Sequence, residues 1–106
     1  MLVALSISPA GEPRTGTSET DGGVSRAVAA AIRVIRGSGL PTETNAMFTN
    51  IEGEWDEVMA VVKQAVDVVA AEYPRVSLVL KADLRTGYDG QLTAKVDRVE
   101  EHLRDG

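Results

Sequence analysis

Residues 45–55 hold most of the side chains that could bind a small polar molecule. The stretch contains two amides, two carboxylates, a hydroxyl, a methionine, a phenylalanine and the only tryptophan, which are Asn45, Asn50, Glu52, Glu54, Thr49, Met47, Phe48 and Trp55. Amides and carboxylates can hydrogen-bond to the edge of a polar ring, while aromatic and thioether groups can cover its flat face. A structural interpretation is also open, because Trp55 could be a packing anchor at a helix start and Glu54 or Asp56 could favour the helix N-terminus.

The sequence offers little for acid–base, nucleophilic or metal chemistry. The single histidine, His102, is expected near the end of a terminal helix, and no other ligand types converge on it, so we interpret it as a solvated surface residue. The absence of cysteine excludes disulfides, thiolate catalysis and the common zinc sites. The glycines at 37–39 and 87–90 lack the spacing of phosphate-binding loops. We therefore expect no catalytic residue, no metal and no cofactor.

The charge balance narrows the classes of partner. With 16 acidic and 11 basic residues the chain carries a formal net charge of −5, which would suit a cationic small ligand. Nucleic-acid binding needs a basic stripe, and the basic residues here are scattered, so we expect no nucleic-acid partner. The chain has no run of about 18 apolar residues, and its apolar start has no basic segment before it, so we expect no membrane partner and a cytoplasmic location.

Hydrophobic periodicity predicts seven secondary-structure elements. In order, they are a strand at 2–7 ended by Pro9, a helix at 24–36 stopped by the glycines at 37–39, extended segments at 42–48 and 49–54, a helix from 55 to about 73, a strand at 76–83 and a terminal helix carrying Leu92, Val96, Val99 and Leu103. An exposed loop is expected at 9–23, with Asp21 or Ser25 as the cap of the first helix. A turn is expected at 87–90.

This element order predicts an α/β (α+β) fold. It is the split βαβ arrangement of a ferredoxin-like βαββαβ sandwich, with an additional C-terminal helix. At 106 residues the chain has the length of one domain, residues 1–106. Two helices would cover one face of the sheet. The other face is expected to carry Ala4, Ser6, Ser8, Ser77, Val79 and Lys81, with Asn45 and Met47 if the second strand runs in the expected register. Such a mixed face is typical of an oligomer interface or a pocket.

Several segments resemble a known family. Asn45-Ala46-Met47, followed by Ile-Glu-Gly-Glu-Trp-Asp-Glu-Val at 51–58, resembles the small thiamine-binding protein family of the YkoF-like superfamily. The segments at 3–9, 34–41 and 75–81 are similar to the same family, so the resemblance covers nearly the whole chain. Two departures are a longer loop at 12–22 and Phe48, where a smaller residue is common.

The resemblance implies non-catalytic binding of thiamine or its hydroxymethyl aminopyrimidine moiety, by a homo-oligomer that forms dimers or tetramers through its sheets. An aminopyrimidine edge offers donors and acceptors side by side, which amide, hydroxyl and carboxylate groups can match. A carboxylate such as Glu52 would favour the thiazolium cation. The ligand-binding residues we expect are Ser6, Ser8, Asn45, Met47, Thr49 and Glu52, with Trp55 as wall or support.

Two other functions stay open on the sequence alone. The first is a structural or regulatory protein-interaction module, whose open sheet pairs with another subunit and binds no small ligand. The second is a small ferredoxin-like enzyme, for example an acylphosphatase-like hydrolase using Arg14 and an asparagine, or a cofactor-free oxygenase. Arg14 lies in a loop without phosphate-binding glycines, and no histidine lies near the pocket candidates. We therefore expect a binding protein and not an enzyme.

Overall fold

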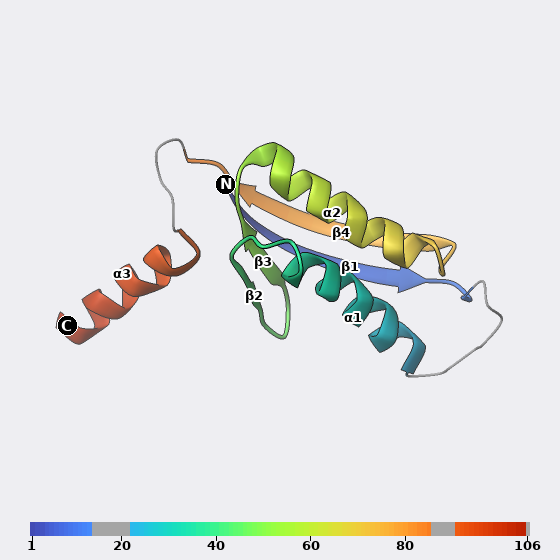
Figure 1. Ribbon diagram of the computed structural model, residues 1–106. Helices are drawn as coiled ribbons and strands as arrows, with labels where there is room; N and C mark the ends of the chain where they lie inside the picture. Colours follow the sequence, from blue (N-terminus) through green and yellow to red (C-terminus); the bar gives the residue numbers. More distant parts are fainter. Residues whose placement is uncertain (14–21, 86–90, 106) are drawn as a thin grey trace.

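The computed structural model describes residues 1–13, 22–85 and 91–105, and forms a four-stranded antiparallel sheet with two helices across one face (Figure 1). The elements are β1 (Leu2–Ala10), α1 (Gly22–Arg36), β2 (Thr42–Thr44), β3 (Thr49–Glu52), α2 (Trp55–Ala70), β4 (Arg75–Asp83) and α3 (Gln91–Asp105). The strands lie in the order β2-β3-β1-β4, and each neighbouring pair is antiparallel. This is the ferredoxin-like order, so the predicted fold class is confirmed.

The core lies between one face of the sheet and the helices α1 and α2. Alternate residues of β1 point toward the helices, because side chains alternate between the two faces of a strand. Val3, Leu5 and Ile7 are at most 8% exposed. The helices contribute apolar residues at helical spacing, which are Ala27, Ala31 and Ile35 from α1, and Val58, Val62, Ala65 and Val69 from α2. Burying a Val, Leu or Ile side chain stabilises the fold by roughly 1.5–3 kcal/mol, so these residues hold both helices on this face.

β1 is longer than predicted. β4 pairs with it along its whole length, from Leu2 opposite Asp83 to Ala10 opposite Arg75. β3 pairs only with residues 2–5, so beyond Leu5 no described strand lies on the β3 side of β1. The expectation that Pro9 ends the strand is wrong, because a proline, which lacks an N–H group, is compatible with an unpaired strand edge.

The hairpin between β2 and β3 also differs from the prediction. β2 ends at Thr44 and not at Phe48, because the side chain of Asn45 reverses the chain. Its Oδ1 accepts hydrogen bonds from the backbone N–H groups of Met47 and Phe48, each at 2.9 Å. This is an Asx turn. Asn45 and Met47 therefore lie at the hairpin tip and not on the open sheet face, which corrects their expected register.

The ends of the two covering helices follow the sequence signals closely. α1 stops at Arg36, where Ser38 Oγ donates to the Ile35 carbonyl at 2.6 Å and Gly39 adopts a φ of +84°, so the predicted glycine stop is confirmed. α2 starts at Trp55 as predicted, and ends at Ala70, about three residues before the predicted end. Ser25 lies inside α1. Asp21, Arg14 and the expected turn at 87–90 lie outside the described residues.

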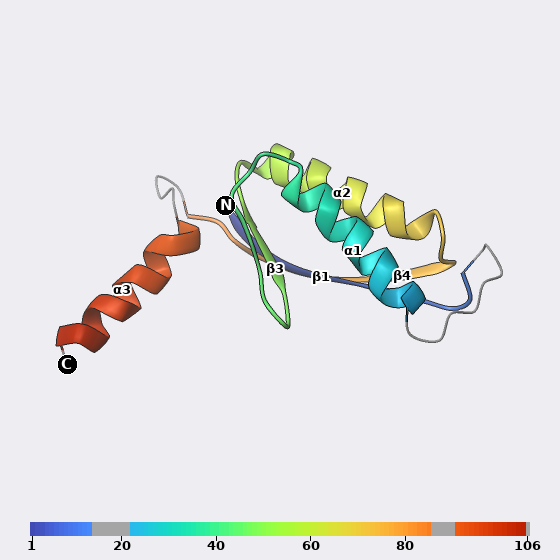
Figure 2. The ribbon, with the colours of Figure 1, turned by 60° about the horizontal axis from the view of Figure 1, so that its bottom comes forward.

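The sheet face away from α1 and α2 carries the residues expected from β1 and β4. The register pairs Ala4 with Lys81 and Ser6 with Val79, and residues paired in this way share a face. The two views in Figure 1 and Figure 2 show α3 projecting beyond the end of the sheet where β1 begins and β4 ends. His102 is exposed on α3, as predicted. Among the described residues, no helix is both long and apolar enough to cross a membrane.

Candidate functional site

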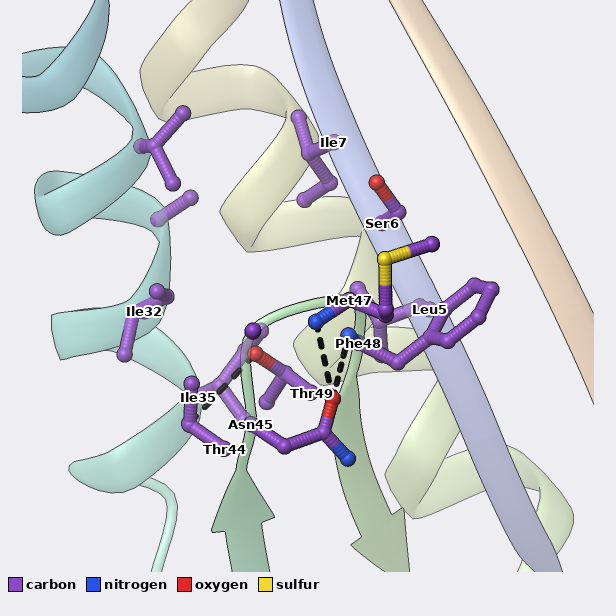
Figure 3. A pocket seen from close by; sticks show the side chains of 13 residues that line it. Leu5, Ser6, Ile7, Ile32, Ile35, Thr44, Asn45, Met47, Phe48 and Thr49 are labelled. Atoms are coloured by element: carbon purple, nitrogen blue, oxygen red, sulfur yellow. Dashed lines mark hydrogen bonds between the residues drawn. The ribbon is translucent and has the colours of Figure 1, made fainter.

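A pocket opens where β1 continues past the start of β3. Its walls are β1, the β2–β3 hairpin and α1 (Figure 3). Its volume is about 180 Å³, which is smaller than the roughly 300–1,000 Å³ of pockets that enclose a drug-sized ligand. Because no described strand lies on the β3 side of β1 here, residues from both faces of β1 border the pocket, Leu5 and Ile7 from the core side and Ser6 from the open side.

The pocket follows from the local backbone. The last pair between β1 and β3 joins Leu5 to Thr49, and from Thr49 toward the tip the hairpin is held by its own Asx turn. The backbone N–H of Asn45 donates to the Phe48 carbonyl at 2.9 Å, which closes the tip without any bond to β1. The hairpin tip is therefore held by hydrogen bonds within itself.

The polar groups of the pocket are an amide and three hydroxyls. Thr44 Oγ1 and Thr49 Oγ1 face each other across the hairpin at 3.4 Å, and Thr49 is only 6% exposed. Ser6 supplies the third hydroxyl from β1. Since Asn45 Oδ1 already accepts two backbone N–H groups, the group that this side chain retains for a ligand is the Nδ2 donor. Hydroxyls can donate or accept, so the set can serve a ligand edge of mixed polarity.

The apolar part of the pocket comes from α1 and from the hairpin tip. α1 contributes Val28, Ala31, Ile32 and Ile35. Phe48 is half-buried with its ring beside β1, and Met47, 73% exposed, lies at the mouth (Figure 3). An aromatic face and a flexible thioether suit contact with a flat ring.

The pocket is electrically neutral among the residues that the structure describes. None of its 13 lining residues is acidic, basic, histidine or cysteine. The lining can therefore bind by hydrogen bonds and apolar contact, but it offers neither a counter-charge nor a group that exchanges protons near neutral pH. Elsewhere in the described ranges, no group of three or more His, Cys, Asp or Glu residues is arranged to hold a metal ion.

Four of the seven expected site residues lie together in this pocket, and three lie elsewhere. The four are Ser6, Asn45, Met47 and Thr49. Ser8 is exposed further along β1, opposite Ser77. Glu52 is 8% exposed, and its Oε1 accepts the Leu92 backbone N–H of α3 at 3.4 Å. Trp55 is 51% exposed at the start of α2 and does not line the pocket.

Sequence reasoning missed the α1 side of the pocket. Val28 and Ile32 have the same helical spacing as the buried Ala31 and Ile35, so periodicity assigns all four to the core. No sequence pattern marked Thr44 as a pocket residue either. Phe48 belongs to the candidate stretch at 45–55 and departs from the family pattern, but it was not among the expected ligand-binding residues.

Around the base of α3 lies a second hollow, of a different character. It is lined by Ala4, Asn50, Lys81, Asp83 and Lys95, together with Leu2 and Ala82. Lys95 Nζ donates to Asp83 Oδ2, and this hydrogen bond and the lysine charge hold the pKa of the Asp83 carboxyl below its usual value. Lys95 and Asp83 therefore form an ion pair, and this contact joins α3 to β4.

The fold and the pocket together define a class, a ferredoxin-like α+β fold with a neutral pocket at its hairpin tip. Comparison with known proteins gives the family. The model of the family described as "Thiamine-binding protein" matches residues 3–100, and the chain belongs to this family. The family predicted from the sequence is confirmed.

Relatives and solved structures agree with this assignment. UPF0045 protein Mb1933 of Mycobacterium bovis is 52% identical over 104 residues, covering 97% of this chain and 94% of the relative. The crystal structure of hypothetical protein MJ1052 from Methanocaldococcus jannaschii is similar with a TM-score of 0.77 at 32% identity, over 94% and 95% of the two chains. A Thermotoga maritima protein described as a candidate for thiamine biosynthesis or salvage shares the fold, with a TM-score of 0.74 at 24% identity over 92% of this chain and 96% of its own.

Proposed function

We propose that this protein binds thiamine or its hydroxymethyl aminopyrimidine moiety in the hairpin-tip pocket, without catalysis, as a cytoplasmic homo-oligomer. The observation that carries the proposal is the composition of the pocket in a chain of the thiamine-binding family. Asn45, Ser6 and Thr49 line the same pocket as Phe48 and Met47, so an amide donor and hydroxyls border it together with an aromatic ring and a thioether. These are the groups that a flat, heteroatom-rich ring requires.

The neutral lining favours the pyrimidine half as the part that is recognised. Thiazolium is a fixed cation, and Glu52, the carboxylate expected to favour it, binds the α3 backbone on the open side of the sheet. An aminopyrimidine is uncharged near neutral pH. Its ring nitrogen can accept from Asn45 Nδ2, and its amino group can donate to a hydroxyl such as that of Thr49. The name of the Thermotoga maritima relative is compatible with such a ligand.

The same lining supports binding rather than turnover. General acid–base catalysis needs a side chain that exchanges protons near the working pH, and nucleophilic catalysis needs a base beside the nucleophile. The Ser6, Thr44 and Thr49 hydroxyls have no basic residue among the described residues that line the pocket. Hydroxyls without such a partner act as hydrogen-bonding groups.

The open sheet face supports a homo-oligomer. Val79, midway along the edge strand β4, is 56% exposed, and the small residue Ser6 of β1 lies opposite it. A face that mixes exposed apolar and small polar residues suits contact with a second copy of the chain. An interaction module without a small ligand would use this face equally well, but it would leave the pocket without a role.

Calorimetric titration with four compounds tests the proposal. They are thiamine, thiamine diphosphate, hydroxymethyl aminopyrimidine and the thiazole alcohol. We expect saturable binding of thiamine and of the aminopyrimidine, and none of the thiazole alcohol. Binding of the thiazole alcohol without binding of the aminopyrimidine would overturn the assignment of the pyrimidine half. If none of the four compounds bound, the interaction module would be favoured.

A further inference from the structure

Helix α3 carries an apolar stripe that its own chain leaves uncovered. Leu92, Val96, Val99 and Leu103 are spaced by four, three and four residues, which places them on one face of a helix. Val96 is 56% exposed, Val99 58% and Leu103 69%. The stripe is therefore exposed over the last three turns of the helix.

Only the base of α3 is tied to the rest of the chain. The Leu92 N–H donates to Glu52 Oε1, and Lys95 pairs with Asp83. Beyond Lys95 the helix projects away from the sheet, as Figure 1 and Figure 2 both show. The radius of gyration is accordingly 16.0 Å, whereas a compact chain of this length has about 13 Å.

A projecting helix of this length needs a partner. Helices shorter than about 12–15 residues are marginal in water, and most helical stability in proteins comes from packing of an apolar face. α3 has 15 residues, so it lies at this limit. The family model runs through residue 100 and so includes most of α3, which makes the helix part of the family domain.

The open sheet face is a second uncovered surface among the described residues. Along β1 it presents the small residues Ala4, Ser6 and Ser8, and beside them on β4 the exposed Val79 lies between the exposed Ser77 and Lys81. Two such faces stacked at the usual spacing of about 10 Å would leave space unfilled, because the β1 side chains are short. The branched Val and Leu side chains of a helix would fill that space.

We propose that the apolar stripe of α3 packs on the open sheet face of a second copy of the chain. The proposal rests on the homo-oligomer proposed above and names the surfaces that form it. One contact of this kind covers both exposed surfaces at once. Pairing of two α3 helices would leave the sheet face open, and the stripe spans about two heptads, short of the three or four that define a coiled coil. The helix is anchored pointing away from its own sheet, so its own face is not its partner.

Disulfide trapping tests the proposal cleanly, because the chain contains no cysteine. The Val79→Cys variant and the Val99→Cys variant are purified separately, mixed so that subunits exchange, oxidised mildly and analysed on a non-reducing gel. A disulfide forms only when the two Cα atoms come within about 7 Å. We expect a covalent dimer that depends on mixing the two variants. As the matched control, the Glu101→Cys variant, on the far side of α3 from the stripe, is expected to cross-link to Val79→Cys at least several-fold less.

Each other outcome overturns the proposal. Dominant cross-linking of Val79→Cys with itself would mean sheet-to-sheet packing, and dominant self-cross-linking of Val99→Cys would mean pairing of two α3 helices. No mixed dimer in a protein that light scattering shows to be oligomeric would reject this contact and leave the homo-oligomer intact. A monomeric mass for the unmodified protein would reject both. The ligand titration described above is independent of all these outcomes.

Discussion

Asn45 stabilises the hairpin turn, and in the proposed function it would also donate a hydrogen bond to the ligand. Its Oδ1 holds the hairpin tip through the N–H groups of Met47 and Phe48, and its Nδ2 remains for a ligand. Removing the side chain removes both. A test of its role in binding must therefore keep the turn and change only the donor.

Comparing Asn45→Asp with Asn45→Ala separates the two tasks. Aspartate keeps an oxygen acceptor for the turn and lacks the Nδ2 donor, so we expect near-native thermal stability but weaker binding of the uncharged hydroxymethyl aminopyrimidine. Loss of one hydrogen bond costs about 0.5–1.5 kcal/mol, or roughly a 2- to 12-fold increase in Kd. Alanine is expected to lower both the affinity and the unfolding temperature. Calorimetry and thermal denaturation measure the two effects.

The opposite result would be equally clear. If Asn45→Asp bound the neutral pyrimidine as tightly as the unchanged protein, the Asn45 amide would have a structural role only. Recognition would then rest on the hydroxyls of Ser6, Thr44 and Thr49, which line the same pocket.

Among the elements, α3 owes its position to a charged contact that depends on pH. The hydrogen bond and charge of Lys95 lower the pKa of the Asp83 carboxyl below its usual value of 3.8. A carboxyl whose pKa is lower in the folded state contributes stability above its unfolded pKa and loses it as the pH falls through the folded value. The contact is thus expected to persist at neutral pH and to weaken only in acid, below pH 3.8.

An NMR titration of the Asp83 carboxyl measures this effect. The Lys95→Met variant is expected to raise the pKa of Asp83 toward its usual value. Lys63→Met is the matched control, because Lys63 pairs with Asp67 within α2. An Asp83 pKa that stayed unchanged in Lys95→Met would show that the contact with α3 is absent in solution.

The sequence predicts the elements well wherever one periodicity dominates. The apolar alternation of β1 and the helical spacing of α1 and α2 reflect burial on one face, and the structure buries that face. The hairpin was predicted less well. The extended residues around Asn45 have strand-like types, and only the two bonds made by its side chain reveal a turn. A local hydrogen bond of this kind leaves no periodic pattern.

The sequence indicated which kinds of side chain border the candidate pocket, but it did not distinguish the residues that line the pocket from those that lie elsewhere. Glu52 and Thr49 are three residues apart in one strand, so they point to opposite faces, and only Thr49 reaches the pocket. Which face borders a pocket depends on where the neighbouring strand stops. That point is set by the pairing of β3 with β1, which no single segment encodes.

At the scale of the whole molecule, the exposed stripe of α3 predicts the mass in solution. We expect light scattering at micromolar concentration to give a dimer or a tetramer. Val99→Glu places a charge in the centre of the stripe, and burying an unpaired charge is strongly unfavourable, so a smaller mass is expected. Glu101→Ala changes the opposite side of the same helix and should keep the native mass. An unchanged mass for Val99→Glu would place the interface elsewhere.

Pro9 lies in the part of β1 that has no described strand on its β3 side. An unpaired strand edge is a template to which a strand from another chain can add, and repeated addition leads to aggregation. Proline withholds one backbone donor from that edge, and the exposed Ser8 beside it adds a polar side chain. The same unpaired edge of β1 that borders the pocket is thus open to strands of other chains, and we expect Pro9 to make their addition less favourable.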